Sequence, residues 1–283
     1  MLDCIIVGSG TAGVSAALTL KANAKEFMLI GPSELSEKIE KAELIRNYPG
    51  LSKISGKDFC AALKTQLAEM EIPVTDEKVT GVYALNEKFG VATSQGGYYE
   101  ARTVILACGV ESIKTIAGET ELVGKGVSYC ATCDGFLYKG KTIGVLCTAK
   151  RLEHEIEYLA NLAQKVYAVP MYKPVEIKAE NVEIIRKMPL EIQGDTRVTG
   201  MRFADKEVAL DGFFALRESV PPTILTQGIE TENGHIKVDR EMATNLVGCY
   251  AAGDCTGRPY QYAKAVGEGN IAAHSVTAFL AKV

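Results

Sequence analysis

The chain opens with a mostly apolar segment that runs directly into a glycine-rich turn. Residues 2–7 read as a strand, and the next six residues are Gly8-Ser9-Gly10-Thr11-Ala12-Gly13. An Ala- and Leu-rich pattern with helical periodicity follows, to about Leu20. A strand, a glycine turn and a helix in this order make up the dinucleotide-binding unit of a Rossmann-like domain. This stretch therefore predicts an α/β fold that binds a dinucleotide near its N-terminus.

Each glycine of this turn has its own expected role. Gly8 permits the tight turn, Gly10 lets a pyrophosphate approach the backbone, and Gly13 lets the helix pack close to the sheet. The phosphate would then face the N-terminus of the helix, whose N–H groups and dipole favour an anion. The strand expected at 27–30 runs into Gly31-Pro32-Ser33-Glu34. In this kind of unit the second strand usually ends at an acid that binds the ribose hydroxyls. Here that acid is missing from the strand end, because Glu34 stands several residues further along the chain.

A second constraint lies near the middle of the chain, where two cysteines stand three positions apart. The sequence there reads Cys130-Ala131-Thr132-Cys133-Asp134-Gly135. Two such thiols can cycle between dithiol and disulfide, and at the start of a helix the dipole favours the thiolate. Half of a zinc site and two buried thiols are the alternatives. Because no second CxxC or His-x-x-x-His lies nearby and His154 stands alone, zinc would be short of ligands. We favour redox chemistry and expect no metal.

Composition and charge limit the classes of partner. The chain has 283 residues and a formal net charge of -4, which suggests neither nucleic acid nor an anionic membrane surface as a partner. No apolar run reaches the length of a transmembrane helix. The chain enters a strand without a basic leader or cleavage site, so we expect a cytoplasmic protein. Most of its eight cysteines should then stay reduced and pack as small buried hydrophobes, namely Cys4, Cys60, Cys108, Cys147 and Cys249.

A second strand–helix–strand unit follows the cysteine pair. We expect a strand over 140–146, a helix over 152–163 and a strand over 166–169. The turn between the first two reads Cys147-Thr148-Ala149-Lys150-Arg151 and contains no glycine. A pyrophosphate cannot come close to a turn lined with Cβ atoms. The second strand ends in Pro170-Met171-Tyr172-Lys173, without an Arg pair for a 2′-phosphate. This unit is predicted to keep the fold of a nucleotide domain without its site.

Three further stretches fit a bound nucleotide. The buried strand expected at 103–106 ends in the small residues Ala107-Cys108-Gly109, which suit a return beneath the nucleotide. Near the C-terminus, a strand-like segment at 249–252 is followed by Gly253-Asp254, and then by Gln261-Tyr262-Ala263 and a glycine-containing helix. An acid at a strand end, followed by a helix N-terminus of small residues, suits the ribityl chain and ring edge of a flavin.

These stretches occur in the order found in the low-molecular-weight thioredoxin reductases, which the chain resembles over essentially its whole length. The resemblance rests on residues 8–13, Asn47-Tyr48-Pro49-Gly50, residues 130–135, Ala251-Ala252-Gly253-Asp254 and residues 261–269. In that family an inserted domain, which carries the cysteine pair and the NADPH site, splits the FAD domain. The resemblance therefore implies an α/β fold with two Rossmann-like (three-layer ββα) domains.

The same resemblance implies the domain boundaries. The FAD domain is expected to be discontinuous, over 1–112 and 236–283, with the inserted CxxC domain over 113–235. Here the inserted domain has lost its NADPH-type turn. In this the chain resembles the ferredoxin-dependent flavin thioredoxin reductases of clostridia, which take electrons from ferredoxin. The diflavin reductases of some cyanobacteria also lack the NADPH motifs and remain a second possibility.

Roles for individual residues also follow from the resemblance. Cys133 matches the thiol that faces the flavin, Cys130 the thiol that attacks thioredoxin, and Asp134 the acid that manages the proton. Cys108 departs from the family's Thr before Gly109, and for Cys255 we favour packing over a second redox role. The expected FAD contacts are Gly8, Ser9, Gly10, Thr11, Ala12, Gly13, Asn47, Ala107, Cys108, Gly109, Gly253, Asp254, Gln261, Tyr262 and Ala263.

The implied function is reduction of the thioredoxin disulfide with electrons from reduced ferredoxin, through FAD and the Cys130–Cys133 pair. Thioredoxin and ferredoxin are the expected partners, and the family implies a homodimer. An enzyme of the same fold that uses NADPH or a second flavin, and a non-enzymatic flavin-binding redox sensor, remain alternatives. Basic residues around the cysteines are either a dock for an acidic ferredoxin or ordinary solvated charges, namely Lys125, Lys139, Lys141, Lys150 and Arg151.

Overall fold

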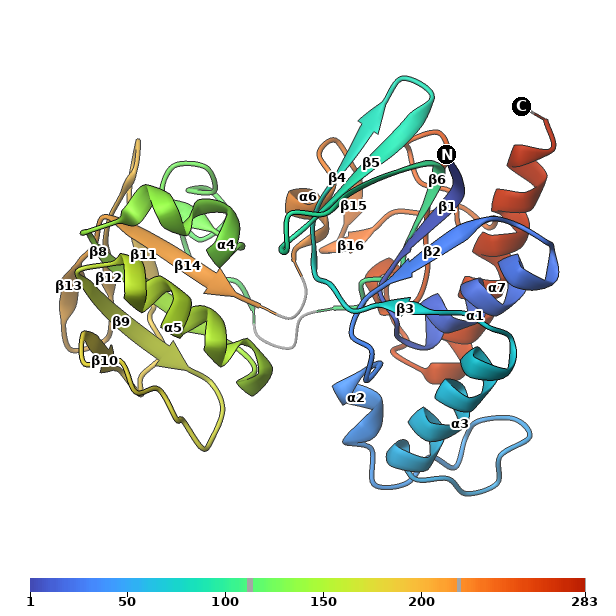
Figure 1. Ribbon diagram of the computed structural model, residues 1–283, viewed down its shortest axis with the longest axis horizontal. Coiled ribbons are helices and arrows are strands. Elements are labelled where there is room, and N and C mark those ends of the chain that lie inside the picture. The colour runs from blue at the N-terminus through green and yellow to red at the C-terminus, as the bar shows by residue number, and fades with distance from the viewer. Residues whose placement is uncertain (111–113, 218–219, 283) are drawn as a thin grey trace. The chain divides into compact units, whose positions relative to one another are not determined.

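The computed structural model describes residues 1–110, 114–217 and 220–282 and divides into two compact units (Figure 1). The first unit combines Met1–Val110 with Pro221–Val283, and the second is Glu111–Val220. The first expected boundary, at 112/113, falls within residues 111–113, which are outside the described residues. The chain re-enters the first unit at Pro221, earlier than the residue 236 expected from the sequence.

The early return to the first unit has a packing reason. Helix α6 (Pro222–Leu225) buries Leu225, and the next residue, Thr226, forms a parallel bridge with Val82. Val82 belongs to strand β4 (Val79–Leu85) of the first unit. These contacts tie the segment from Pro221 onward to the first unit. The short hairpin of β15 (Thr231–Glu232) and β16 (His235–Ile236) then follows within the same unit.

A parallel sheet forms the centre of the first unit. Strand β1 forms over the expected residues, and it pairs with β2 on one side and with β6 on the other. Strand β17 continues the sheet beyond β6, where Ala251 lies opposite Leu106. The carboxyl ends of these strands therefore meet at one edge of the sheet. The strands in spatial order are β3 (Val74–Thr75), β2 (Phe27–Ile30), β1 (Leu2–Val7), β6 (Tyr98–Leu106) and β17 (Cys249–Ala251).

The alternating pattern over residues 74–99, interrupted by the turn residues Asn86-Glu87 and Gly96-Gly97, predicts a small antiparallel meander, and this prediction is only partly right. Strand β4 pairs with β5 (Lys88–Thr93), and β5 pairs with the first half of β6, where Phe89 lies opposite Ala101. Val74 instead lies opposite Leu29 in a parallel pair, so β3 belongs to the central sheet. The reason is that β3 follows a helix that crosses back over the sheet, and such a crossover places the next strand parallel to the first.

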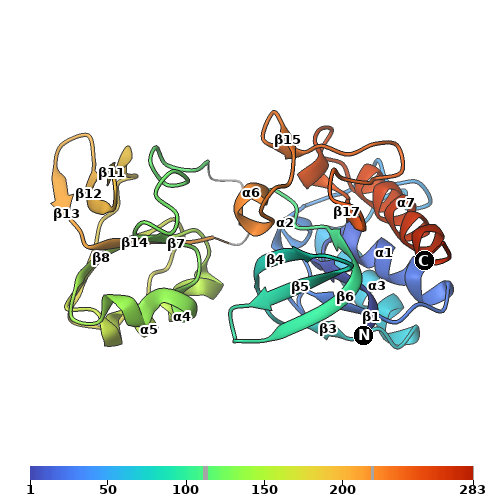
Figure 2. The same cartoon turned by 90° about the horizontal axis from the view of Figure 1, so that it is seen from above.

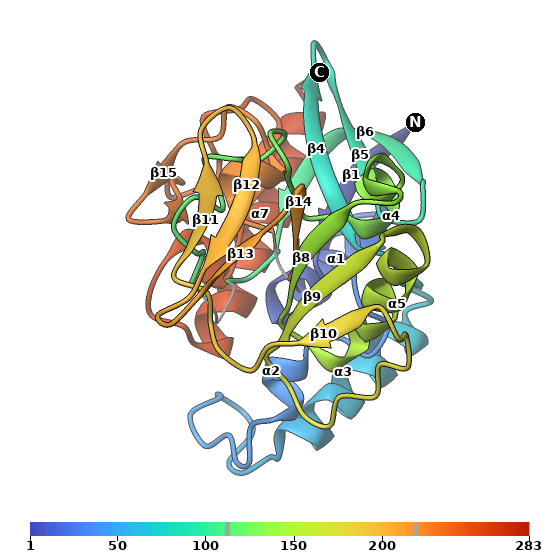
Figure 3. The same ribbon diagram turned by 90° about the vertical axis from the view of Figure 1, so that its left-hand side faces the viewer.

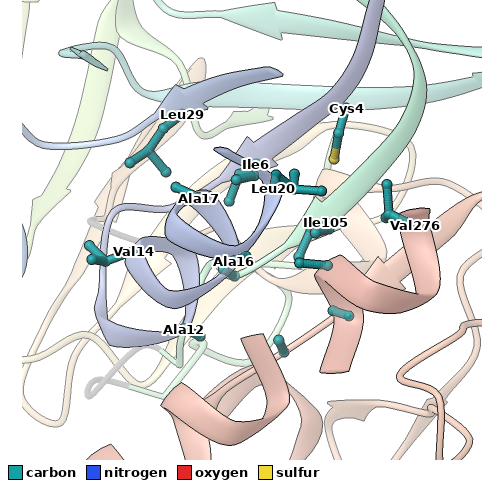
Figure 4. Packing of buried hydrophobic residues seen from close by; sticks show 14 of the residues in the cluster. Cys4, Ile6, Ala12, Val14, Ala16, Ala17, Leu20, Leu29, Ile105 and Val276 are labelled. Atoms are coloured by element: carbon teal, nitrogen blue, oxygen red, sulfur yellow. The ribbon is translucent and has the colours of Figure 1, made fainter. Parts of the chain in front are cut away.

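Helices α1 (Thr11–Ala22) and α7 (Tyr262–Leu280) pack side by side on this sheet (Figures 1 and 4). A Cβ atom at Gly269 would lie 2.1 Å from the carbonyl oxygen of Ala12, so the two helices approach this closely only because residue 269 is glycine. Together with the strands they enclose the main core, whose central members are Cys4, Ile6, Ala16, Ala17, Leu20, Ile105, Ala272 and Val276.

Phe59, Leu63 and Leu67 stand at helical spacing, which predicts an amphipathic helix over 55–70 with these residues on its core face. Helix α3 (Gly56–Glu69) forms within this stretch. Phe59 and Leu67 are buried on its inner face, as predicted, and Leu63 is partly buried. The Ser55 hydroxyl caps the helix by accepting a hydrogen bond from the Asp58 N–H at 3.1 Å. The charged stretch before it forms only the short helix α2 (Glu37–Glu40).

The second unit contains its own parallel sheet, with strand order β10-β9-β8-β14-β7 (Figure 3). Helices α4 (Ala131–Asp134) and α5 (Glu153–Leu162) lie on one face of this sheet, and a small antiparallel sheet lies on the other (Figure 2). The parallel strands are β7 (Val127–Ser128), β8 (Thr142–Cys147), β9 (Lys165–Pro170), β10 (Val182–Ile184) and β14 (Gly212–Leu216). The antiparallel strands are β11 (Glu191–Gly194), β12 (Val198–Arg202) and β13 (Glu207–Ala209).

The predicted fold class, α/β with two Rossmann-like domains, is confirmed. The described residues also form short 3₁₀ turns at η1 (Gly135–Tyr138), η2 (Lys150–Leu152) and η3 (Asp254–Thr256). In the described part of the chain, no helix combines the length and the apolar character needed to cross a membrane.

The cap of α3 gives a test of the fold. Replacing Ser55 by Ala removes the acceptor for the Asp58 N–H, so we expect the free energy of unfolding to fall by about 1 kcal/mol. Urea denaturation followed by circular dichroism measures this loss. Ser52→Ala, in the exposed loop just before the helix, is the matched control and should leave stability unchanged. Equal stability of the two variants would contradict the assigned cap.

Candidate functional site

The glycine turn after β1 has the geometry of a phosphate cradle. A Cβ atom at Gly8, where φ is +112°, would lie 2.3 Å from the Ala107 carbonyl oxygen. At Gly13 a Cβ would lie 1.8 Å from the Gly8 carbonyl oxygen. At Gly10, by contrast, no protein atom would lie within 4 Å of a Cβ. The protein's own packing requires Gly8 and Gly13, whereas the space beside Gly10 is open for a ligand.

The same turn leaves donors for an anion at the start of α1. Gly10 caps the helix without any side-chain hydrogen bond, so the first N–H groups have no acceptor from a cap. The Ser9 hydroxyl donates instead to the Pro32 carbonyl at 2.7 Å, which joins the turn to the end of β2. A Cβ atom at Gly31 would lie 2.6 Å from the Ser9 nitrogen. Gly31 was not among the predicted site residues, although a glycine directly after a strand was the available signal.

Glu34, the late candidate for a ribose contact, lies on the surface. Its side chain is 83% exposed and its carboxylate pairs with the Lys64 ammonium. The partner explains how the charge is satisfied without a ligand. The position of this pair gives no sign of a nucleotide contact.

Residues from distant parts of the chain meet beside the start of α7. The Asn47 side-chain amide donates to Gln261 Oε1 at 2.6 Å, across 214 residues of sequence. The Tyr262 hydroxyl lies 3.5 Å from the Lys38 carbonyl oxygen, and Ala263 is exposed in the first turn of the helix. Four of the predicted cofactor residues, Asn47, Gln261, Tyr262 and Ala263, thus lie at the N-terminus of one helix.

Asp254 lies at the carboxyl edge of the sheet, directly after β17, where a polar network holds the turn. Gly253 has a φ of +89°, and its N–H donates to Glu268 Oε2 at 2.8 Å. The Lys264 ammonium donates to the carbonyl oxygens of Gly253 at 2.8 Å and Gly257 at 2.7 Å, and it lies 3.1 Å from Glu268. Burial raises the pKa of Asp254 above its usual range, although the charges of Lys38 and Lys264 act against this. Lys264 and Glu268 were not predicted, and their spacing of four residues on a helix was the signal.

Ala107, Cys108 and Gly109 follow β6 at the same edge. Ala107 is buried beneath the glycine turn, and Gly109 has a φ of +66°. Cys255 is fully buried, and its sulfur lies 3.3 Å from the carbonyl oxygens of both Leu106 and Ala252, either of which can accept from its single S–H. The Cys108 and Cys255 thiols also form a hydrogen bond with each other, which lowers the pKa of Cys108 and raises the pKa of Cys255.

The second unit presents a disulfide at the start of α4. Cys130 and Cys133 are bonded to each other, with their Cα atoms 5.3 Å apart. Cys130 is the N-cap of the helix, and its sulfur accepts a hydrogen bond from the Cys133 N–H at 3.2 Å. Cys130 is buried, whereas Cys133 is exposed. Asp134, the last residue of α4, is half-buried. The pair therefore lies at the start of a helix, the condition under which the helix dipole favours the thiolate.

The turn after β8 is filled by the chain itself. Ala149 is buried there, and Glu153 at the start of α5 accepts hydrogen bonds from Lys150 at 2.6 Å, Tyr172 at 3.0 Å and the Glu176 N–H at 3.1 Å. Burial acts to raise the pKa of Glu153, but these hydrogen bonds outweigh it and hold the pKa below its usual range. A carboxylate therefore lies where a dinucleotide-binding unit would hold a phosphate, and it would repel one.

Comparison with known proteins identifies the family. Residues 2–269 match the family described as pyridine nucleotide-disulphide oxidoreductase. A crystal structure of a ferredoxin-flavin thioredoxin reductase from Clostridium acetobutylicum has a TM-score of 0.94 and 42% identity, with 99% of this chain and 98% of that chain covered. A thioredoxin reductase from Gloeobacter violaceus has a TM-score of 0.83 and 27% identity, with 99% and 94% covered.

A curated relative agrees with these structures. The thioredoxin reductase of Listeria monocytogenes is 33% identical, with 98% of this chain and 93% of the relative covered. The matches therefore extend over both units rather than over the glycine turn alone. The chain belongs to the pyridine nucleotide-disulphide oxidoreductase family and, within it, to the thioredoxin reductases of the ferredoxin-flavin type.

Proposed function

We propose that this chain is an FAD-containing enzyme that reduces the disulfide of thioredoxin with electrons from reduced ferredoxin. The observation that carries the proposal is the contrast between two turns. The turn after β1 is open beside Gly10, whereas Ala149 and Glu153 fill the turn after β8. One dinucleotide site is present, and the place where relatives would receive a nicotinamide nucleotide is closed by the protein's own side chains.

The residues at the edge of the first sheet fit FAD. The N–H groups at the start of α1 suit its pyrophosphate, Asp254 suits the ribityl hydroxyls, and the Asn47–Gln261 pair with Tyr262 suits the ring edge. The remaining predicted contacts, from Ala107 to Gly109, follow β6, where Ala107 and Cys108 pack against Gly8 of the glycine turn. FAD, when bound, supplies the link between one-electron and two-electron transfer.

The cysteine pair is the exit for the electrons. Its reduction takes two electrons and breaks the Sγ–Sγ bond, and the proton it requires is assigned to Asp134. The Cys133 N–H, 3.2 Å from Cys130 Sγ, stabilises a thiolate on Cys130. That thiolate attacks one sulfur of the thioredoxin disulfide and forms a mixed disulfide. Cys133 then attacks Cys130 Sγ, which releases reduced thioredoxin and restores the oxidised pair.

The overall transfer is thermodynamically downhill without a nicotinamide. A ferredoxin of the plant type has a potential near about -400 mV, and thioredoxin lies near about -270 mV. The difference corresponds to about 6 kcal/mol for the two electrons that one disulfide requires. The electron transfer from ferredoxin to thioredoxin therefore needs no nicotinamide nucleotide to be favourable.

The exposed lysines and the cysteines outside the pair bear on the partners and the location of the protein. Acidic ferredoxins favour a basic dock, and Lys125, Lys139 and Lys141 are exposed in the unit that carries the disulfide. Lys150 is engaged by Glu153 and Glu176, so it contributes less. The six cysteines outside the pair, all among the described residues, form no disulfide, which suits a reducing compartment such as the cytoplasm. The family resemblance supports a homodimer.

The electron donor is the most direct test. Purified, FAD-loaded protein is supplied with thioredoxin and either photoreduced ferredoxin or NADPH, and thioredoxin thiols are counted over time. We expect turnover with ferredoxin and a rate at least about 100-fold lower with NADPH, because the second turn admits no pyrophosphate. Fast turnover with NADPH would overturn the proposal. Reversible formation of the disulfide without turnover from either donor would favour the redox sensor.

The two cysteines should differ in their roles. Cys130→Ser is expected to abolish thioredoxin reduction while leaving the Cys133 thiol able to interact with the flavin. Anaerobic turnover and the visible spectrum of the reduced protein measure both effects. Cys60→Ser, at a buried free thiol in the first unit, is the control and should retain turnover. A Cys130→Ser variant with full activity would show that the pair is not the exit.

Two glycine substitutions separate cofactor binding from folding. Gly10→Ala meets no protein atom, so we expect the melting temperature of the flavin-free protein to stay close to wild type while FAD affinity falls at least about tenfold. Gly13→Ala places a Cβ against the Gly8 carbonyl and should destabilise the protein itself. Differential scanning calorimetry and fluorescence titration with FAD measure the two effects. Unchanged FAD affinity in Gly10→Ala would contradict the assigned pyrophosphate site.

A further inference from the structure

Two thiols outside the Cys130–Cys133 pair meet at the carboxyl edge of the first sheet. Strand β17 runs parallel to β6, with Ala251 opposite Leu106. Cys108 comes shortly after the end of β6, and Cys255 lies in the 3₁₀ turn η3 that follows β17. The two thiols form a hydrogen bond with each other. The parallel pairing of the strands therefore brings together two cysteines that lie far apart in the sequence.

The two thiols have different surroundings. Cys255 is fully buried, and its sulfur lies 3.3 Å from the carbonyl oxygens of Leu106 and Ala252. Cys108 is only half-buried. The single S–H of Cys255 thus has three possible acceptors, which are the two carbonyl oxygens and the Cys108 sulfur. A thiolate on Cys108 is the strongest of the three because it carries a full charge. Cys255 is therefore placed to donate to that thiolate and to stabilise it.

Cys108 also differs from the other cysteines outside the Cys130–Cys133 pair. All six lie among the described residues, and five of them are buried. Burial raises the pKa of Cys4, Cys147 and Cys249 to about 12, so these thiols stay protonated and poorly reactive near neutral pH. The hydrogen bond from Cys255 instead lowers the pKa of Cys108. A half-buried thiol with a stabilised thiolate and a second thiol in contact has the features of a cysteine that is oxidised reversibly.

We propose that Cys108 and Cys255 form a second redox pair, whose oxidant is hydrogen peroxide. Packing is the usual role of a single buried thiol such as Cys255, but the contact with Cys108 gives it a reaction partner. Peroxide is small and neutral, so it can reach a half-buried sulfur that the disulfide of another protein cannot approach. The inference does not rest on the proposed function.

The reaction of this second pair takes place in two balanced steps. The Cys108 thiolate attacks one oxygen of peroxide and breaks the O–O bond. Cys108 becomes a sulfenic acid, and the other oxygen leaves as hydroxide, which takes up a proton to form water. The Cys255 sulfur then attacks Cys108 Sγ, so that the Sγ–Sγ bond forms and the S–O bond breaks. The hydroxyl leaves with the Cys255 proton as a second water. One peroxide thus takes up the two electrons that the two thiols lose.

Peroxide oxidation of a chain without the Cys130–Cys133 pair tests this assignment. The FAD-loaded Cys130→Ser/Cys133→Ser variant is reduced with dithiothreitol, desalted under nitrogen and treated with an equimolar amount of hydrogen peroxide. We expect loss of two of the six remaining thiols and a linked Cys108–Cys255 peptide in mass spectrometry of the non-reduced digest. Cys108 should be oxidised at least about tenfold faster than Cys60, a buried thiol of the same unit.

Two further substitutions in this variant assign the roles of the two sulfurs. Cys255→Ser removes the sulfur that attacks the sulfenic acid. Peroxide should then leave on Cys108 a sulfenic acid that dimedone labels, with no linked peptide. Cys60→Ser is the matched control, because it also removes a buried thiol of the first unit, and it should form the linked peptide as its parent does.

Each outcome decides the question. The inference falls if Cys108 and Cys255 keep their thiols, or if Cys60 is oxidised as fast as Cys108. It also falls if dithiothreitol does not restore the two lost thiols, since a disulfide is reducible and a sulfinic acid is not. These results come from the parent variant, so they hold even if Cys255→Ser fails to fold. The measurement uses neither ferredoxin nor thioredoxin. A wild-type chain that fails to reduce thioredoxin would therefore refute the proposed function and leave this inference standing.

Discussion

The close approach of backbone segments at the carboxyl edge of the first sheet is the constraint on which the rest depends. The turn after β1 touches both the loop after β6 and the first turn of α1, so closely that a single Cβ at Gly8 or Gly13 would overlap a carbonyl group. Gly269 lets α7 approach Ala12 in the same way. These contacts bring the two ends of the chain together around one edge, where residues from 8 to 263 converge.

The second unit shows the same topology without the same site. Its strand–turn–helix also leads from a central strand into a helix that covers the sheet, yet the turn carries side chains and a buried carboxylate instead of glycines. Glu153, held by Lys150, Tyr172 and the Glu176 N–H, supplies charge that opposes a phosphate as well. The fold of a nucleotide domain has been kept as a platform for the disulfide.

Much of this arrangement could be predicted from the sequence because local patterns determine it. The strand at 2–7, the roles of Gly8 and Gly13, and the helix that follows them each depend on neighbouring residues. The failures depend on distant contacts instead. Val74 joined the parallel sheet through its pairing with Leu29, and the return to the first unit at Pro221 depends on a bridge to Val82. The buried ion pair of Glu119 and Arg217 in the second unit spans 98 residues and left no local trace in the sequence.

The central claim is that the chain has one dinucleotide site, not two. Equilibrium titration of the purified protein with FAD, followed by calorimetric titration of the loaded protein with NADPH, measures this directly. The account predicts one FAD per chain and no saturable binding of NADPH at micromolar concentrations. A second FAD per chain, or saturable NADPH binding that displaces no flavin, would contradict it.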